Sequence, residues 1–311
     1  MNLESIGFYT LSDDRVKQAS EHSPLWRCEL LVTKRCNFSC PYCRSVGPSE
    51  DLSWTDAKVI LSKWFAQNLK NIRFSGGEPT LWEYLYNAVW LCKLNGVENI
   101  AISTNGSANL SVYKTLLEVG ANDFSVSLDA CCAEDNTKMT GRKKAFDNIV
   151  ESIKFLSSKT YVTVGIVLTE DNESKVNEIV QFAKSLGVSD VRVIPAAQYG
   201  SVLPTIKTDG MPILEYRRKM AENGGTVRGL SPTDSRRCHL ALDDMVVIGT
   251  DHYPCIIHAR EGGQSIGSIL DDFRQDRANW ARNYDVFTDK ICRENCLDVC
   301  REYNNKFSEL S

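Results

Sequence analysis

Short apolar runs alternate with amphipathic stretches over residues 27–195 of the chain. The apolar runs have the length and composition of buried strands, and they fall at six places, 27–33, 71–74, 98–103, 123–129, 161–168 and 191–195. Between them, apolar residues three or four positions apart predict helices at 53–65, 82–94, 110–119, 145–156 and 174–186. Strands that alternate with helices favour parallel βα units. The pattern therefore predicts an α/β fold, a partial (β/α)6 TIM-like barrel that is open on one side.

Unusual polar motifs follow the first four predicted strands. In a barrel of parallel strands, the loops after the carboxyl ends of the strands meet on one face, where chemistry collects. Agreement among several loops carries more weight than any single motif. The motifs are, in chain order, Cys36, Cys40 and Cys43, then Gly76-Gly77-Glu78-Pro79, then Ser103-Thr104-Asn105, then Ser127 and Asp129.

The first of these motifs, Cys36-x3-Cys40-x2-Cys43, offers three thiolates close together. A structural zinc site or a ferredoxin-type cluster takes four protein ligands. Three thiolates instead suit an iron–sulfur cluster with one iron left open. The alternatives are a zinc knuckle that borrows Cys28, or three unrelated buried thiols.

Composition narrows the function classes. The chain has 311 residues, with 36 Lys plus Arg against 40 acidic residues, so nothing predicts the basic face that binds long nucleic acid. Twelve cysteines without a secretory signal predict metal ligands or reactive thiols in a reducing cytoplasm, more than disulfides. No apolar run approaches the length of a membrane span.

The cysteine loop and the glycine-rich loop together resemble the signature loops of the radical S-adenosylmethionine (SAM) superfamily, over about residues 28–196. The resemblance implies that Cys36, Cys40 and Cys43 hold a [4Fe–4S] cluster whose open iron is chelated by SAM. Reduction, by a donor such as flavodoxin or ferredoxin, then cleaves SAM to a 5′-deoxyadenosyl radical that abstracts hydrogen from a substrate. The protein would be an oxidoreductase in which the cofactor carries the hard chemistry.

The same resemblance implies which residues contact SAM. The glycine-rich loop would receive the amino group, Tyr42 and Ile194 would lie near the adenine, and the third and fourth strand ends would bind the ribose or methionine. Either Lys138 or Arg142 would bind the carboxylate, and both stay open. Cys131 and Cys132 follow Asp129 at the barrel mouth, where a thiol could donate a hydrogen atom to a substrate radical. The expected SAM contacts are Tyr42, Gly76, Gly77, Glu78, Ser103, Thr104, Asn105, Ser127, Asp129 and Ile194.

Five further cysteines lie near the carboxyl terminus. Cys238 and Cys255 flank a predicted hairpin, and Cys292, Cys296 and Cys300 recur at four-residue intervals that stack on one helical face. The pattern resembles the auxiliary-cluster extensions of the SPASM and twitch subgroups. It implies one auxiliary [4Fe–4S] cluster, held by Cys238, Cys255 and two of the other three. A zinc ribbon is the alternative, because cysteine spacing separates zinc from iron–sulfur poorly. The four histidines show no metal-ligand spacing and are expected to be surface or satisfied polar residues.

The expected domains are a flanking segment at 1–25, the barrel at 26–205, a connector at 206–235 and the auxiliary-cluster domain at 236–311. The short flanking segment leaves little room for the leader-recognition domain of peptide-modifying relatives. A small-molecule or nucleoside-type substrate is therefore expected, for an oxidation, rearrangement or bond formation. The alternatives are a peptide or protein maturase, an enzyme that modifies or isomerises a base in nucleic acid, and a non-catalytic iron–sulfur scaffold.

Overall fold

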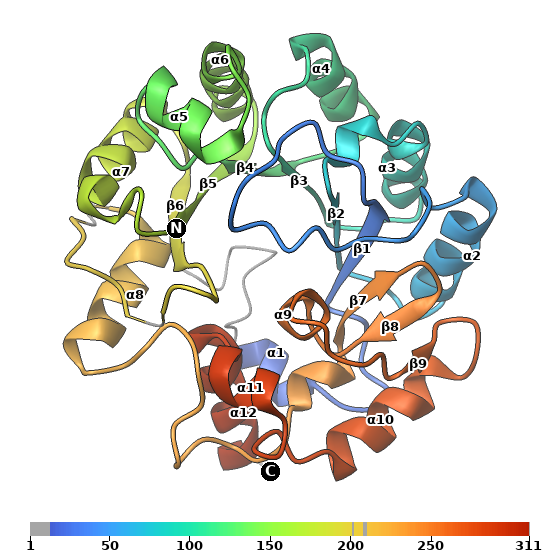
Figure 1. Ribbon diagram of the computed structural model, residues 1–311. Coiled ribbons are helices and arrows are strands. Elements are labelled where there is room, and N and C mark those ends of the chain that lie inside the picture. The colour runs from blue at the N-terminus through green and yellow to red at the C-terminus, as the bar shows by residue number, and fades with distance from the viewer. Residues whose placement is uncertain (1–12, 201, 208–209, 311) are drawn as a thin grey trace.

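The computed structural model describes residues 13–200, 202–207 and 210–310 and shows a curved parallel sheet with helices around its outer side (Figure 1). Six of its strands follow one another in parallel, in sequence order. The predicted α/β partial barrel is confirmed, and the sheet does not close on itself. The strands are β1 (Arg27–Thr33), β2 (Asn71–Gly76), β3 (Asn99–Thr104), β4 (Asp123–Ser127), β5 (Tyr161–Leu168) and β6 (Asp190–Pro195).

Each of the five links between these strands carries a helix on the outside of the sheet (Figure 1). The link from β4 to β5 also carries α5 (Ala133–Thr140), which the apolar pattern did not predict because this helix has few buried apolar positions. Short 3-10 turns lie at Pro79–Leu81 and Glu173–Lys175. The remaining covering helices are α2 (Trp54–Phe65), α3 (Leu85–Leu94), α4 (Leu110–Val119), α6 (Phe146–Ser157) and α7 (Val176–Ser185).

The two faces of the strands differ in polarity, because side chains alternate along a strand. The face toward the helices is apolar and forms the main core, which includes the buried thiols of Cys28 and Cys92. The inner face is polar. Ser75 Oγ donates a 2.5 Å hydrogen bond to Glu29 inside the barrel, and Asp123 on β4 is also buried there. The barrel interior can therefore hold a polar ligand.

The carboxyl-terminal third continues the barrel sheet. The strand β7 (Asp244–Ile248) pairs in parallel with β1, and the antiparallel strands β8 (Asp251–Tyr253) and β9 (Gly267–Ser268) follow it at the sheet edge. The remaining elements lie on the open side of the barrel (Figure 1). They are α8 (Pro212–Glu222), a 3-10 turn at His239–Leu242, α9 (Ile256–Arg260), α10 (Phe273–Asn283), α11 (Lys290–Asn295) and α12 (Asp298–Leu310).

A short helix before the barrel, α1 (Asp13–Gln18), packs on α12. Its Arg15 side chain is 3% exposed, forms an ion pair with Asp243 and lies 4.7 Å from the ring of Tyr303. This part of the predicted flanking segment is thus tied to the carboxyl-terminal elements. Within the described ranges, no helix has both the length and the apolar character to cross a membrane.

Candidate active site

The loop that carries Cys36, Cys40 and Cys43 follows β1 and covers the carboxyl ends of the strands (Figure 1). Backbone amides already point at two of its sulfurs, because Phe38 N–H donates to Cys36 Sγ at 3.4 Å and Ser45 N–H donates to Cys43 Sγ at 3.3 Å. Hydrogen bonds from amides to sulfur help to set the reduction potential of iron–sulfur clusters. The donor set, three thiols of which two accept amide hydrogen bonds, fits the cluster that the sequence predicts.

The glycines of the second loop hold the cysteine loop in place. A side chain on Gly76 would meet Thr33 O at 2.2 Å, and one on Gly77 would meet Arg35 O at 2.1 Å. The backbones are joined at these points, since Gly77 N–H donates to Thr33 O at 2.7 Å and Glu78 N–H donates to Arg35 O at 2.8 Å. Both glycines therefore allow a close backbone contact with the cysteine loop.

Glu78 is 1% exposed, and its carboxylate joins the ends of β2 and β3. It accepts hydrogen bonds from Thr80 N–H and Oγ1, from Thr104 Oγ1 and from Asn105 N–H, at 2.7 to 3.1 Å. Burial nevertheless raises its pKa. A carboxylate offers about four acceptor positions. Three of these donors reach Oε1 and one reaches Oε2, so Oε2 keeps an acceptor position for a ligand amino group, whereas the hydroxyl of Thr104 is already bonded to Oε1.

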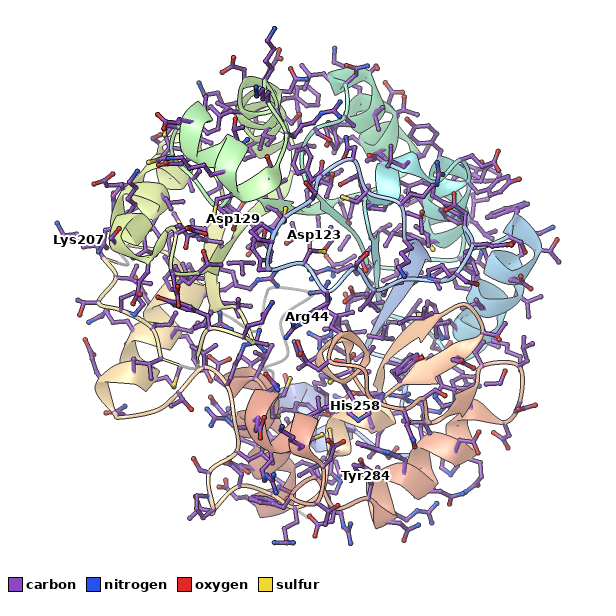
Figure 2. The ribbon with its side chains drawn as sticks, viewed as in Figure 1. Arg44, Asp123, Asp129, Lys207, His258 and Tyr284 are labelled. Carbon is purple, nitrogen blue, oxygen red and sulfur yellow. The ribbon has the colours of Figure 1, made fainter. Side chains whose placement is uncertain are left out.

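The side chains of Asn105 and Tyr42 also form hydrogen bonds that hold the loops of the site together. Asn105 Nδ2 donates to Asn37 Oδ1 at 2.8 Å and lies 3.8 Å from Cys36 Sγ. Tyr42 O–H donates to Asp129 Oδ2, and Val167 N–H donates to Asp129 Oδ1 at 2.7 Å. Burial raises the pKa of Asp129 to about 6. Asp129 therefore links the cysteine loop to β5, near the barrel interior (Figure 2).

The two thiols after Asp129 lie at the start of α5. Cys132 is exposed, and Cys131 packs partly against the apolar core. Burial raises the pKa of the Cys131 thiol, and the nearby carboxylates of Glu178 on α7 and Asp135 on α5 raise it further. The surroundings of Cys131 are thus the helices α5 and α7. Among the described residues, neither thiol forms a hydrogen bond with the cysteine loop.

The two candidates for a carboxylate partner differ in their surroundings. Lys138 lies on the surface of α5, where it pairs with Glu134 at 3.2 Å and Asp135 at 3.8 Å. Arg142 is exposed and follows Gly141, which touches the cysteine loop so closely that a side chain there would meet Ser39 Oγ at 2.2 Å. Arg142 is the candidate whose backbone adjoins the cysteine loop.

Three predicted contacts lie on inner strand positions. Ser103 on β3 and Ile194 on β6 are half-buried, and Ser127 at the end of β4 is exposed. Between them lies a residue that the sequence reading missed, Arg192 on β6. Its Nη2 lies 3.4 Å from Ser125 Oγ and 3.5 Å from the position of a side chain on Gly165.

Arg192 is a half-buried cation with few partners. Burial, together with the neighbouring Arg73, lowers the pKa of Arg192 to about 9. A second guanidinium nearby in the fold, that of Arg228, donates from Nε to Pro195 O at 2.9 Å, and its buried Nη1 has no hydrogen-bond partner in the described part of the chain. The sequence signals were an arginine within an apolar strand and a glycine in the middle of the strand beside it.

All five carboxyl-terminal cysteines line one cavity between α9, α11 and α12. The cavity holds about 580 Å³ of empty space, counting the solvent at its mouth. Cys238 Sγ accepts a contact from Asn304 Nδ2 at 3.7 Å, and Cys255 Sγ accepts one from His258 N–H at 3.4 Å. The thiol set fits a four-iron cluster.

Comparison with known proteins agrees with this architecture. Residues 30–183 match the family model of the Radical SAM superfamily. A structure of native anSMEcpe with bound AdoMet is similar to this protein, with a TM-score of 0.61 at 15% identity. The similarity covers 91% of this chain and 96% of that chain. Against Streptococcus suis SuiB bound to S-adenosylmethionine the TM-score is 0.60 at 17% identity, with 84% of this chain and 66% of that chain covered. At these identities the two structures show the fold alone. The chain belongs to the radical SAM superfamily.

Curated relatives match somewhat more than half of the chain. A GTP 3′,8-cyclase of Staphylococcus epidermidis strain RP62A is 33% identical over 189 residues, which are 57% of this chain and 51% of the relative. A probable GTP 3′,8-cyclase of Saccharolobus islandicus is 29% identical over 176 residues, 55% of this chain and 57% of the relative. The chain thus spans about half the length of the curated relatives it matches.

Proposed function

We propose that this protein is a radical SAM enzyme that abstracts hydrogen from a small, anionic, nucleotide-type substrate and uses one auxiliary [4Fe–4S] cluster. The observation that carries the proposal is the cysteine loop. Amide hydrogen bonds fix two of its thiols, and the backbone contact with Gly76 and Gly77 holds the loop over the open end of a polar barrel.

Cys36, Cys40 and Cys43 would hold the first cluster. With SAM bound, the cluster supplies an electron for SAM cleavage and thereby a 5′-deoxyadenosyl radical. The chain supplies position. Arg142, beside the cysteine loop, is our choice over Lys138 for the SAM carboxylate, because Lys138 is already paired with Glu134. Backbone carbonyls of the Gly76-Gly77 loop, together with Oε2 of Glu78, would receive the amino group.

The substrate class follows from the charge of the barrel interior. Arg192 is half-buried, and its only hydrogen bond within the described ranges is the long one to Ser125. Partial removal of an unpaired charge from water is unfavourable, and an anionic ligand would offset that penalty. Arginine suits phosphate and carboxylate because its planar fork binds two oxygens. The relatives named GTP 3′,8-cyclase support a nucleotide among such anions.

The proposal of an auxiliary cluster is based on the thiols that line the cavity between α9, α11 and α12. Cys238 and Cys255 with two of Cys292, Cys296 and Cys300 would complete its coordination, in a twitch-like or SPASM-like arrangement. An electron acceptor there suits an oxidation. We place the protein in the cytoplasm, with flavodoxin or ferredoxin as the electron donor.

Anaerobic reconstitution tests the proposal. The wild-type protein is expected to bind about eight iron atoms and to convert SAM to 5′-deoxyadenosine after reduction. The variant with Cys36→Ala, Cys40→Ala and Cys43→Ala should keep about half of the iron and lose all SAM cleavage. A wild-type protein that holds zinc at the first loop, or never cleaves SAM, would contradict the proposal and favour a scaffold.

Deuterated nucleotides tested for label transfer into 5′-deoxyadenosine identify the substrate. Arg192→Ala should raise KM for an anionic substrate about 10- to 100-fold, the range expected for a lost charged hydrogen bond. The control is Arg218→Ala, because Arg218 lies on the outside of α8 and pairs with Glu222. Label transfer from a peptide or from nucleic acid instead would overturn the substrate class.

A further inference from the structure

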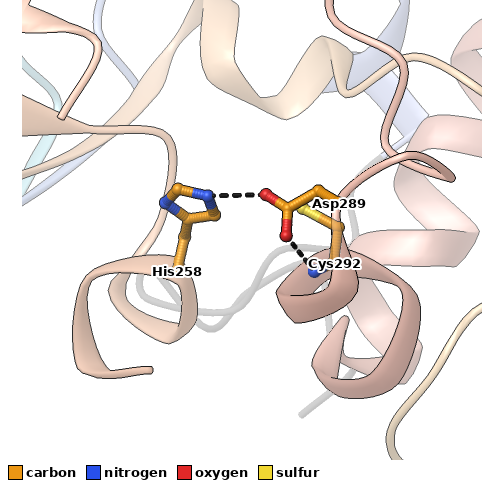
Figure 3. Close-up of side chains that lie close together, drawn as sticks. All are labelled: His258, Asp289 and Cys292. Carbon is orange, nitrogen blue, oxygen red and sulfur yellow. Dashed lines mark hydrogen bonds and ion pairs between the residues drawn. The ribbon is translucent and has the colours of Figure 1, made fainter. Parts of the chain in front are cut away.

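His258 lies on the segment that carries Cys255, and its side chain points toward the segment that carries Cys292 (Figure 3). It is 4% exposed and belongs to α9, the helix that begins after Cys255. Its backbone N–H donates to Cys255 Sγ at 3.4 Å. Its ring reaches across to the loop before α11, where Nε2 lies 2.8 Å from Asp289 Oδ2. One residue thus contacts both segments.

Asp289 connects the ring of His258 to the backbone of Cys292. Its Oδ1 accepts from Ile291 N–H at 2.6 Å and from Cys292 N–H at 3.4 Å, so it caps the start of α11. Its Oδ2 also accepts from Tyr284 O–H at 2.7 Å. The position of Cys292 is therefore set by a carboxylate that His258 and Tyr284 hold.

The ring of His258 has little freedom. A side chain on Gly263 would meet its Nδ1 and Cε1 at 2.2 Å, so the backbone of Gly263 packs directly on the far edge of the ring. Nδ1 is buried and has no hydrogen-bond partner in the described part of the chain. The contact with Asp289 is consequently the polar interaction that the ring makes.

We propose that His258 is a positioning residue for the auxiliary cluster, which couples Cys255 to Cys292 and makes Cys292 one of the ligands taken from the carboxyl-terminal helices. The inference rests on the proposed auxiliary cluster. Outer-shell partners that orient metal ligands commonly change metal affinity about 10- to 100-fold when they are removed. Here the orientation acts through the helix cap and not through direct contact with iron.

A mononuclear metal is the competing interpretation. One ligand atom each of His258, Asp289 and Cys292 lie within 4.8 Å of one another. The hydrogen-bond interpretation accounts better for the contacts, because both Asp289 oxygens are already used by donors and the His258 to Asp289 distance is that of a hydrogen bond.

The test uses the full chain with Cys36→Ala, Cys40→Ala and Cys43→Ala, so that only the auxiliary cluster contributes iron and spectra. In this parent, His258→Phe should release iron to a chelator about tenfold faster and alter the electron paramagnetic resonance signal of the reduced cluster. His258→Gln should largely restore both, because an amide can still donate to Asp289. His22→Phe, outside the cavity, is the control, and circular dichroism checks that each variant is folded.

The outcomes separate the two proposals. A parent that binds about four irons supports the auxiliary cluster, and the histidine variants then decide the role of His258. Equal iron release by His258→Phe and the parent would overturn that role, as would a full cluster in Cys292→Ser. A parent that binds zinc lost on His258→Phe would overturn both proposals in favour of the mononuclear site.

Discussion

At the scale of single residues, glycines and buried carboxylates build the site as much as the cysteines do. Gly76 has a φ of +136°, and Gly77 leaves no room for a side chain against Arg35 O. Glu78 accepts hydrogen bonds from Thr104 and Asn105 at the end of β3, and Asp129 accepts one from Tyr42. These residues bring together loops that are far apart in sequence, and they thereby fix where the thiols lie.

Gly77→Ala should displace the cysteine loop. A methyl group there would lie 2.1 Å from Arg35 O, so one of the two backbones must shift. We expect a loss of about 1–3 kcal/mol in the free energy of unfolding, the usual cost of overpacking. The variant should also lose about half of its bound iron, because only the first cluster depends on this loop.

Gly165→Ala is the matched control, because a methyl group there meets Arg192 Nη2 at an ordinary 3.5 Å. Iron counting and urea unfolding of both variants provide the measurement. Full iron occupancy in Gly77→Ala would show that the close backbone contact is not needed to hold the cluster.

The sequence predicted the cysteine and glycine loops because their residue types and spacing are distinctive. It could not predict which groups Glu78 and Asp129 bind, since their partners Thr104, Asn105 and Val167 come from other strands. Arg192 was missed for a related reason: an arginine in a strand has meaning only when the barrel places it opposite Ser125 and Gly165. His258 carried no spacing signal, because its partner Asp289 lies 31 residues away.

At the scale of elements, the strand–helix alternation was predictable, whereas contacts between distant elements were not. The six strands stood out because their apolar face packs on helices. The helix α5 has mainly polar residues, so it gave no periodic signal. One contact between elements, from β6 to α8, has a consequence for stability.

Asp190 at the start of β6 is fully buried and accepts from Ile213 N–H of α8 at 3.2 Å. Burial raises its pKa from the usual 3.8 to about 6. The native state therefore binds more protons than the unfolded state between these values, and this residue makes the protein less stable as the pH rises through them.

Asp190→Asn should remove that penalty, because an amide stays neutral and still accepts the hydrogen bond. At about pH 8, we expect the free energy of unfolding of the variant to exceed that of the wild type by at most about 3 kcal/mol. The difference should shrink at about pH 5. Urea unfolding at both pH values measures it. Asp147→Asn, on the exposed side of α6, is the control. A difference that does not change with pH would show that the carboxyl of Asp190 titrates normally.

At the scale of the whole molecule, the barrel and the cysteine-rich elements share one sheet. The strand β7 pairs with β1 from Arg27 to Leu31, and Leu31 packs with Val246 and Ala259. Buried ion pairs cross the same boundary, with Arg27 to Asp244 at 2.5 Å and Arg217 to Asp298 at 3.0 Å. The sequence indicated separate domains because composition changes near residue 236, and parallel pairing over more than 200 residues leaves no local pattern.

A chain that ends at residue 235 is therefore expected not to fold. It would lose the neighbour of β1 and would leave Arg217 without Asp298, although both side chains of that pair are at most 2% exposed in the full chain. Removing one partner of a buried ion pair costs about 3–5 kcal/mol, and a typical domain has only about 5–15 kcal/mol in total. Size-exclusion chromatography and circular dichroism of the shortened chain are the direct measurement. In the full chain, tryptophan fluorescence and cluster absorbance should report one common unfolding transition, as expected for a single cooperative unit. A soluble shortened chain that still binds a cluster at Cys36, Cys40 and Cys43 would instead show that the barrel at 26–205 is an independent domain.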